Sequence, residues 1–121
     1  MKKQILIIED ESLVAMDLQM SILSWGYECP FIAYNGRESY LWIRKNSTDL
    51  IIADLFQNNG KNNIPYLKKI RKHSQAPMII FSSVMDEKIL EKTLKLKPRC
   101  FLFKPWHNHE LKINVDLVLK I

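Results

Sequence analysis

The stretch that decides the fold reads Asp49-Leu50-Ile51-Ile52-Ala53-Asp54. An apolar run bounded by a carboxylate on each side suits a short strand that is buried on both faces of a parallel sheet. A helix would need more length and a 3.6-residue period. Asp54 then stands at the carboxyl end of the strand, which is the edge where open α/β sheets bind their ligands.

Three further apolar runs also end at polar residues. They are Ile5–Ile8, followed by Glu9 and Asp10; Met78–Phe81, followed by Ser82; and Cys100–Phe103, followed by Lys104. If the four strands lie parallel, their carboxyl ends meet at one edge of the sheet. The sequence therefore predicts that three carboxylates, a hydroxyl and an ammonium converge there, with Asp54 among them.

Helix signals alternate with these strands. Ser12 is expected to cap a helix whose apolar residues recur at spacings of three and four, and Gly26 is expected to end it. Those residues are Leu13, Met16, Met20 and Leu23. The next strand, Tyr27–Ala33, contains Pro30 and is therefore expected at the edge of the sheet, because proline lacks an N–H donor. Further helices are predicted over about 37–45, 65–72, 86–96 and 110–121, and the polar segment 57–63 is expected to leave Asp54 reachable from solvent.

Composition and length indicate one soluble domain over residues 1–121. The chain is 47% hydrophobic and 26% charged, as in ordinary globular proteins. Cys29 and Cys100 match no metal-binding spacing, and the apolar run after Met1 is too short for a signal peptide or a membrane span, so we expect a cytoplasmic protein. A net charge of +5 admits an acidic partner or nucleic acid. The sequence contains no recognisable nucleic-acid-binding motif, and its lysines are spread over several segments. Both observations argue against direct nucleic-acid binding by this domain.

The predicted acidic cluster has a definite chemistry. Carboxylates held close together repel one another, and a hard divalent cation relieves that repulsion. Mg2+ binds one or two protein carboxylates and leaves coordination sites for phosphate oxygens. A carboxylate can itself attack phosphorus to form an acyl phosphate, while a lysine and a hydroxyl neutralise the charge on the transferring oxygens.

Four motifs together resemble the receiver domains of bacterial two-component response regulators, such as the chemotaxis regulator. They are Ile5–Glu11, Asp49–Asp54, Pro77–Ser83 and Phe101–Trp106, in the family's order and at about its separations. The resemblance covers the whole chain. It implies an α/β, flavodoxin-like (βα)5 fold, a doubly wound three-layer sandwich whose five parallel strands follow the order 2-1-3-4-5.

The resemblance also assigns a role to each motif residue. It implies that Asp54 accepts a phosphoryl group from a phosphohistidine, and that Lys104 and Ser82 contact that group. Phe101 falls on the family's aromatic switch position, and the Lys104-Pro105 bond is expected to be cis. The implied Mg2+ ligands are Glu9, Asp10, Asp54 and the backbone carbonyl of Phe56.

Partners follow from the same resemblance. It implies a sensor histidine kinase or phosphotransfer protein as phosphodonor, and a downstream effector protein or effector domain reached through the surface of the fourth helix, fifth strand and fifth helix. It also admits a homodimer. Lys88, Lys92 and Lys95 fall at helical spacings on the fourth helix. They predict either a solvated face or a docking site for an acidic partner.

Other functions fit the residues less well. Phosphatases of the haloacid dehalogenase type carry a second Asp two residues after the nucleophile, and Phe56 stands there, so turnover of external substrates is not expected. The domain would catalyse only its own phosphorylation and dephosphorylation. Asn58 stands where the family often has proline. A pseudo-receiver that binds partners without phosphorylation is the remaining alternative.

Overall fold

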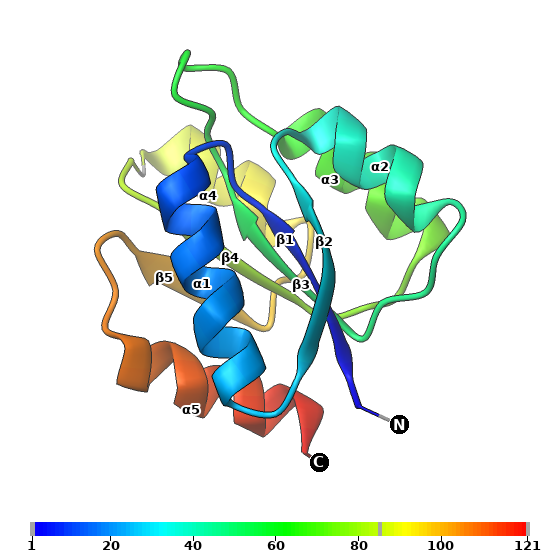
Figure 1. Ribbon diagram of the computed structural model, residues 1–121. Coiled ribbons are helices and arrows are strands. Elements are labelled where there is room, and N and C mark those ends of the chain that lie inside the picture. Colours follow the sequence, from blue (N-terminus) through cyan, green and yellow to red (C-terminus); the bar gives the residue numbers. More distant parts are fainter. Residues whose placement is uncertain (1, 85, 121) are drawn as a thin grey trace.

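Strands and helices alternate along the computed structural model, which describes residues 2–84 and 86–120 (Figure 1). The strands are β1 (Gln4–Ile8), β2 (Glu28–Ala33), β3 (Leu50–Asp54), β4 (Met78–Ser82) and β5 (Cys100–Phe103). The helices are α1 (Ser12–Ser24), α2 (Gly36–Ile43), α3 (Ile64–His73), α4 (Glu87–Leu94) and α5 (Asn108–Leu119). None of the helices in this described part combines the length and the apolar character that crossing a membrane requires.

The five strands form one parallel sheet in the order β2-β1-β3-β4-β5, which confirms the predicted order 2-1-3-4-5. Every residue of β3 and β4 is buried, as expected of central strands with helices on both faces. Strand β2 lies at an edge, where Pro30 coincides with a shift in its register against β1. The edge position that was predicted from Pro30 is therefore confirmed.

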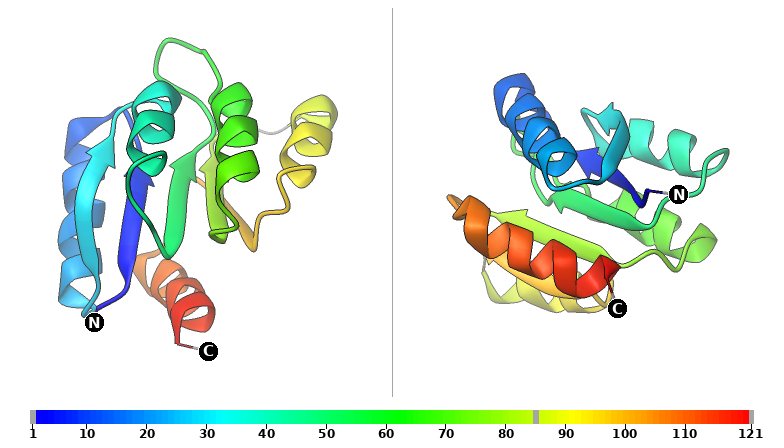
Figure 2. Two further views of the ribbon diagram at one scale, coloured as in Figure 1. Left: turned by 90° about the vertical axis from the view of Figure 1, so that its right-hand side faces the viewer. Right: turned by 60° about the horizontal axis from the view of Figure 1, so that its bottom comes forward.

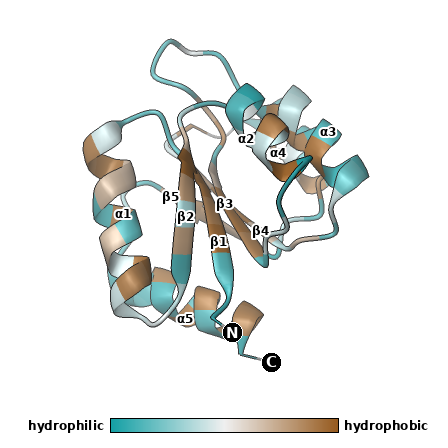
Figure 3. Cartoon of the chain, turned by 45° about the vertical axis from the view of Figure 1, so that its right-hand side comes forward, coloured by the Kyte–Doolittle hydropathy of each residue, from teal (hydrophilic) through white to brown (hydrophobic). Residues whose placement is uncertain are grey.

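Helices cover both faces of the sheet and make a three-layer sandwich (Figure 2). On one face α1 and α5 pack against a core that includes Ile5, Ile7 and Phe81. On the other face α2 and α3 pack against Leu6, Ile8 and Ile80, and Ile89 of α4 packs against the same core. Figure 3 shows the strands as largely hydrophobic and the long loop before α3 as hydrophilic. The arrangement is the flavodoxin-like fold expected from the sequence.

Helix α1 differs from the prediction in two ways. Its N-cap is Glu11, with no side-chain capping bond, instead of Ser12, which is already helical. The residues whose spacing predicted the helix are all exposed, and Leu13 has 83% of its surface in solvent. The buried stripe consists of Ala15, Leu18 and Ile22. Both stripes have helical spacing, so periodicity identified the helix without identifying its buried face.

The other helix boundaries deviate by one or two residues from the prediction, the usual error at helix ends. Asn35 and Asp86 cap α2 and α4, and their side chains accept hydrogen bonds from the backbone N–H groups of Glu38 and Ile89. Gly26 follows α1 with a φ of +94°, a left-handed conformation that glycine adopts without strain. The predicted end of α1 is therefore confirmed.

Candidate functional site

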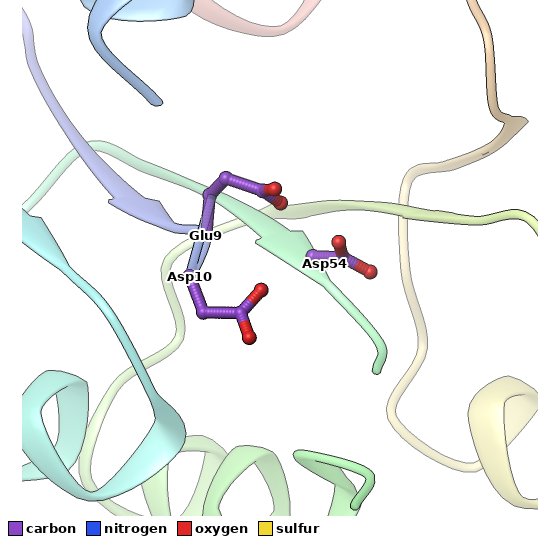
Figure 4. A group of neighbouring side chains, drawn as sticks. All are labelled: Glu9, Asp10 and Asp54. Atoms are coloured by element: carbon purple, nitrogen blue, oxygen red, sulfur yellow. The ribbon is translucent and has the colours of Figure 1, made fainter. Parts of the chain in front are cut away.

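Three carboxylates meet at the carboxyl ends of β1 and β3. Glu9 and Asp10 directly follow β1, and Asp54 is the last residue of β3. One oxygen from each lies within 4.8 Å of the others, and Figure 4 shows the three side chains gathered at this edge of the sheet. Strands β1 and β3 are hydrogen-bonded neighbours, so the convergence predicted from their sequences follows from the strand order.

Lys104, directly after β5, is the cation of this cluster. Its Nζ lies 2.6 Å from Asp54 Oδ2 and 3.3 Å from both oxygens of Glu9. Burial alone would lower the pKa of this ammonium, but the hydrogen bonds and charges of Asp54 and Glu9 outweigh it and raise the pKa. Lys104 is therefore a permanent positive charge beside Asp54.

Burial and a neighbouring carboxylate both disfavour the charged form of Glu9. Its side chain is buried, and burial together with its interactions with Asp54 raises the pKa of Glu9 to about 8, even though Lys104 acts in the opposite direction. A buried carboxylate that is close to a second one favours the protonated form. One positive charge at Lys104 is thus too little for the negative charge assembled here.

Asp10 provides the test of whether the site fits a metal ion. Its Oδ2 accepts a hydrogen bond of 2.6 Å from the backbone N–H of Asn58. Its Oδ1 is buried and has no hydrogen-bond partner among the described residues. A buried, unsatisfied carboxylate oxygen is costly unless a ligand completes it. Carboxylate oxygens are also the donors that Mg2+ prefers, so these residues fit that ion.

Both oxygens of Asp54 are engaged. Oδ1 accepts a hydrogen bond of 3.1 Å from the backbone N–H of Phe56, and Oδ2 accepts the bond from Lys104. Phe56 forms an isolated bridge with Asn62 and so begins the loop that leads to α3. These contacts hold the Asp54 carboxylate in a single orientation at the open edge of the sheet.

The two predicted switch residues, Ser82 and Phe101, lie at the end of β4 and within β5. The Ser82 hydroxyl donates to the Val84 carbonyl at 2.7 Å and accepts from the Val84 N–H at 3.0 Å, so its hydrogen bonds go to its own loop. Phe101 is half-buried, and its ring meets the ring of Phe103 edge-on at 5.3 Å. The Lys104-Pro105 peptide bond is cis, as predicted.

Asn63 was missed by the sequence analysis. Its side chain is almost completely buried. Its Nδ2 donates to the Asp54 carbonyl at 2.9 Å, and its Oδ1 accepts from the Gly36 N–H at 3.0 Å. The Gln57 side chain donates to the same Oδ1 at 3.0 Å. Asn63 thereby joins the strand end that carries Asp54 to the starts of α2 and α3. Its only sequence signal is an asparagine just before Ile64-Pro65 at the start of a helix, which predicts a cap and nothing more.

An open cleft of about 440 Å3 adjoins the cluster on the side of α1. Glu11, Asp17, Lys104 and Trp106 contribute to its lining. The ring of Trp106 packs against Phe81 with centroids 4.6 Å apart. Lys104 is therefore reachable from solvent through this cleft, although Asp54 and Glu9 are buried.

Comparison with known proteins assigns the chain to a family. The sequence pattern described as "Response regulator receiver domain" matches residues 5–116. The chain belongs to this family. It is therefore a receiver domain of two-component response regulators, a signalling domain and not a classical enzyme. The acidic cluster, Lys104 and the cis bond before Pro105 lie where the resemblance in the sequence implied.

Individual relatives are distant. The receiver domain is 26% identical to the transcriptional regulatory protein CrdR of Helicobacter pylori over 95% of this chain and 54% of that protein. It is 26% identical to the transcriptional regulatory protein KdpE of Staphylococcus aureus over 100% of this chain and 52% of that protein. The chain thus spans about half the length of the curated relatives that it matches.

Solved structures support the fold. A CheY-like response regulator receiver domain protein from Methanospirillum hungatei superimposes with a TM-score of 0.91 at 19% identity, over 99% of this chain and 95% of that one. A two-component response regulator from Clostridium difficile gives a TM-score of 0.88 at 24% identity, over 98% of this chain and 97% of that one. At these identities the likeness concerns the fold, and the chemistry of the site has to be argued from the side chains of this receiver domain.

Proposed function

We propose that this receiver domain accepts a phosphoryl group on Asp54 in a Mg2+-dependent reaction and that the modification changes its α4–β5–α5 surface. The observation that carries the proposal is the contact of 2.6 Å between Lys104 and Asp54 inside a cluster of three carboxylates. A lone Asp at a strand end is an ordinary turn residue. An Asp with a half-buried lysine, two further carboxylates and an unsatisfied oxygen beside it is equipped for phosphoryl transfer.

The reaction is a displacement at phosphorus. An oxygen of Asp54 forms a bond to the phosphorus, the bond from phosphorus to the donor's imidazole nitrogen breaks, and the donor histidine keeps the bonding electron pair and takes up a proton. Lys104 then moves its charge from the carboxylate to the phosphoryl oxygens, where negative charge is greatest. The Phe56 N–H holds Asp54 Oδ1 and Lys104 holds Oδ2, so the attacking oxygen uses a lone pair that these hydrogen bonds leave free.

Asp10, Asp54 and the backbone carbonyl of Phe56 would hold Mg2+ directly, with Glu9 completing the acidic pocket. Bound there, the ion would neutralise the negative charge that the donor phosphate brings to the carboxylates. The free Oδ1 of Asp10 is the atom best suited to bind it. Lys104, whose Nζ lies 2.6 Å from Asp54 Oδ2, would supply the second positive charge.

Phosphorylation would act on the rest of the domain through Ser82. The phosphoryl group adds a charge of roughly −1.5 to −2 and strong hydrogen-bond acceptors. A phosphoryl oxygen offers the Ser82 hydroxyl a stronger acceptor than the Val84 carbonyl that it contacts at 2.7 Å. Ser82 pairs with Phe103 across β4 and β5. A movement of Ser82 would therefore be felt at Phe101 and at the α4–β5–α5 surface.

The partners follow from this chemistry. The donor would be the phosphohistidine of a sensor kinase or phosphotransfer protein, and the recipient of the signal would be an effector protein or effector domain. Two of the relatives are named transcriptional regulatory proteins, so control of transcription is the output that we propose. These partners imply a cytoplasmic setting, and phosphorylation could act by promoting a homodimer.

The test is the intact mass after incubation with Mg2+ and acetyl phosphate. We expect the parent to gain one phosphoryl group, and we expect the Asp54→Asn variant and the sample with chelator to gain none. A phosphoryl group on the Asp54→Asn variant would move the acceptor to another residue. No gain in any sample would contradict the proposal and indicate a pseudo-receiver that binds its partners without phosphorylation.

A further inference from the structure

Positive charge is concentrated on α2 and α3. Residues 36–45 and 64–73 together carry seven lysines and arginines and only one carboxylate, Glu38. This excess exceeds the net charge of +5 for the whole chain. Six of the seven are exposed, namely Arg37, Arg44, Lys45, Lys68, Lys69 and Lys72, and we call them the α2–α3 basic face.

The close packing of α2 on α3 brings these two segments together (Figures 1 and 2). A Cβ atom at Gly36 would lie 2.7 Å from the Cβ of Tyr66, so the helices approach as closely as glycine permits. Lys69 Nζ lies 5.7 Å from the ring centre of Tyr40 on α2 and 5.2 Å from that of Tyr66 on α3. The guanidinium carbon of Arg44, at the C-terminal end of α2, lies 5.6 Å from the centre of the same Tyr40 ring. The cations of both helices therefore belong to one surface.

The basic face is not neutralised by the protein itself. Every ion pair among the described residues involves Lys104, Lys112 or Lys120. Glu38 accepts a hydrogen bond of 3.0 Å from the Tyr34 N–H and is thereby committed to the start of α2. Arg71 of α3 has an internal role, since it donates hydrogen bonds to the Leu96 and Ala76 carbonyls. The remaining cations point to an external anion.

Helix α4 provides the contrast within the same molecule. Its lysines Lys88, Lys92 and Lys95 share the segment 86–95 with three carboxylates, Asp86, Glu87 and Glu91. All six residues are exposed. This segment therefore carries no net charge, and its lysine stripe attracts a distant polyanion far less than the α2–α3 basic face does.

We propose that the α2–α3 basic face binds the phosphate backbone of nucleic acid without sequence preference. The sequence argued against such binding because the lysines are spread over several segments, and the fold removes that argument by joining two of them. A docking site for a folded protein needs an apolar centre, and a membrane surface needs apolar side chains that insert. Leu41, with 42% of its surface exposed, is the single large aliphatic side chain in solvent on described α2 and α3. Phosphates need only lysines and arginines.

The experiment measures binding of a labelled DNA duplex of arbitrary sequence by fluorescence anisotropy as salt is raised. If about four phosphates are contacted, the affinity should fall about 100-fold between about 50 and 200 mM salt. The test variant is Lys45→Glu/Lys68→Glu/Lys72→Glu, because the side chains of these three described residues take part in none of the ion pairs within the protein. The matched control is Lys88→Glu/Lys92→Glu/Lys95→Glu on α4, which changes the net charge by the same amount.

We expect the α2–α3 variant to lose more than tenfold in affinity and to show a shallower salt dependence, while the α4 variant stays within threefold of the parent. Equal losses in both variants, or no binding by the parent at low salt, would overturn the proposal. So would tighter binding of anionic phosphatidylserine vesicles or polyglutamate than of the duplex at equal salt. Thermal unfolding by circular dichroism checks the fold, and the same three positions changed to Gln replace the test variant if it is unfolded. The proposal does not depend on phosphorylation of Asp54.

Discussion

Glu9 is a carboxylate whose charged form is disfavoured by burial and by Asp54 and favoured by Lys104. It is buried beside Asp54, and its pKa is raised to about 8, against 4.5 for an ordinary glutamate. In the folded protein Glu9 therefore keeps its proton over a pH range in which the unfolded chain has lost it. Folding then binds a proton, and the free energy of unfolding falls as the pH rises from about 4.5 to about 8.

The Glu9→Gln variant should remove this pH dependence. In metal-free protein we expect it to resemble the parent near pH 4.5 and to be more stable by roughly 1–3 kcal/mol at pH 8, because glutamine carries no charge to bury. Urea unfolding at a series of pH values, with a chelator present, measures this. A variant that is less stable than the parent at pH 8 would mean that the pairing of Glu9 with Lys104 outweighs burial.

At the scale of single residues, the sequence predicted the groups at strand ends and missed those in loops. Asp54 and Lys104 could be predicted because each stands at the carboxyl end of an apolar strand, and the strand order brings those ends to one side of the sheet. Asn63 could not, because its three partners, Asp54, Gly36 and Gln57, come from three different segments. The rotation of the Ser82 hydroxyl toward Val84 is a local choice between acceptors that no residue pattern encodes.

The sequence pattern of α1 predicted the position of this helix correctly but not which of its faces is buried. It carries two apolar stripes, and the one with the larger side chains faces solvent. The buried stripe includes the small Ala15, which lets the helix lie close to the sheet. Sequence periodicity fixed where the helix runs, and packing against β1 and β2 decided which stripe is buried. The second choice depends on the neighbours of the helix and is therefore invisible in the sequence of α1.

Two leucine-to-alanine changes on α1 test this orientation. Leu18 is 2% exposed and Leu23 is 52% exposed. Leu18→Ala should lower the free energy of unfolding by about 2–5 kcal/mol because it leaves a cavity. Leu23→Ala should change it by less than about 1 kcal/mol, as is usual for exposed sites. Urea unfolding of both variants gives the comparison, and similar losses would show that α1 is rotated relative to the structure described here.

At the scale of the whole molecule, the acidic cluster would couple the proposed binding of Mg2+ to folding. Glu9 and Asp10 follow β1 and Asp54 ends β3, so the cluster exists only when the sheet is formed. An ion that binds the folded chain alone stabilises it, by about 2.7 kcal/mol at a concentration of 100 times the dissociation constant. The sequence could predict this assembly because it follows from the strand order alone.

Mg2+ should accordingly raise the midpoint of thermal unfolding in the parent. The Asp10→Asn variant should lose most of that rise, because it replaces the carboxylate whose Oδ1 lacks a partner. The control is sodium chloride at matched ionic strength, which screens charges without occupying the site. An equal rise in the parent and in the Asp10→Asn variant would place the stabilising ion elsewhere.

The contact between Gly36 and Tyr66 reaches further than the two helices that it joins. Gly36 also donates its N–H to Asn63, and Asn63 holds the carbonyl of Asp54. A larger residue at position 36 would push α3 away and pull on the strand end that carries the proposed phosphoacceptor. A side chain at position 36 should therefore impair signalling as well as packing, although Gly36 itself makes no hydrogen bond to the proposed phosphoacceptor.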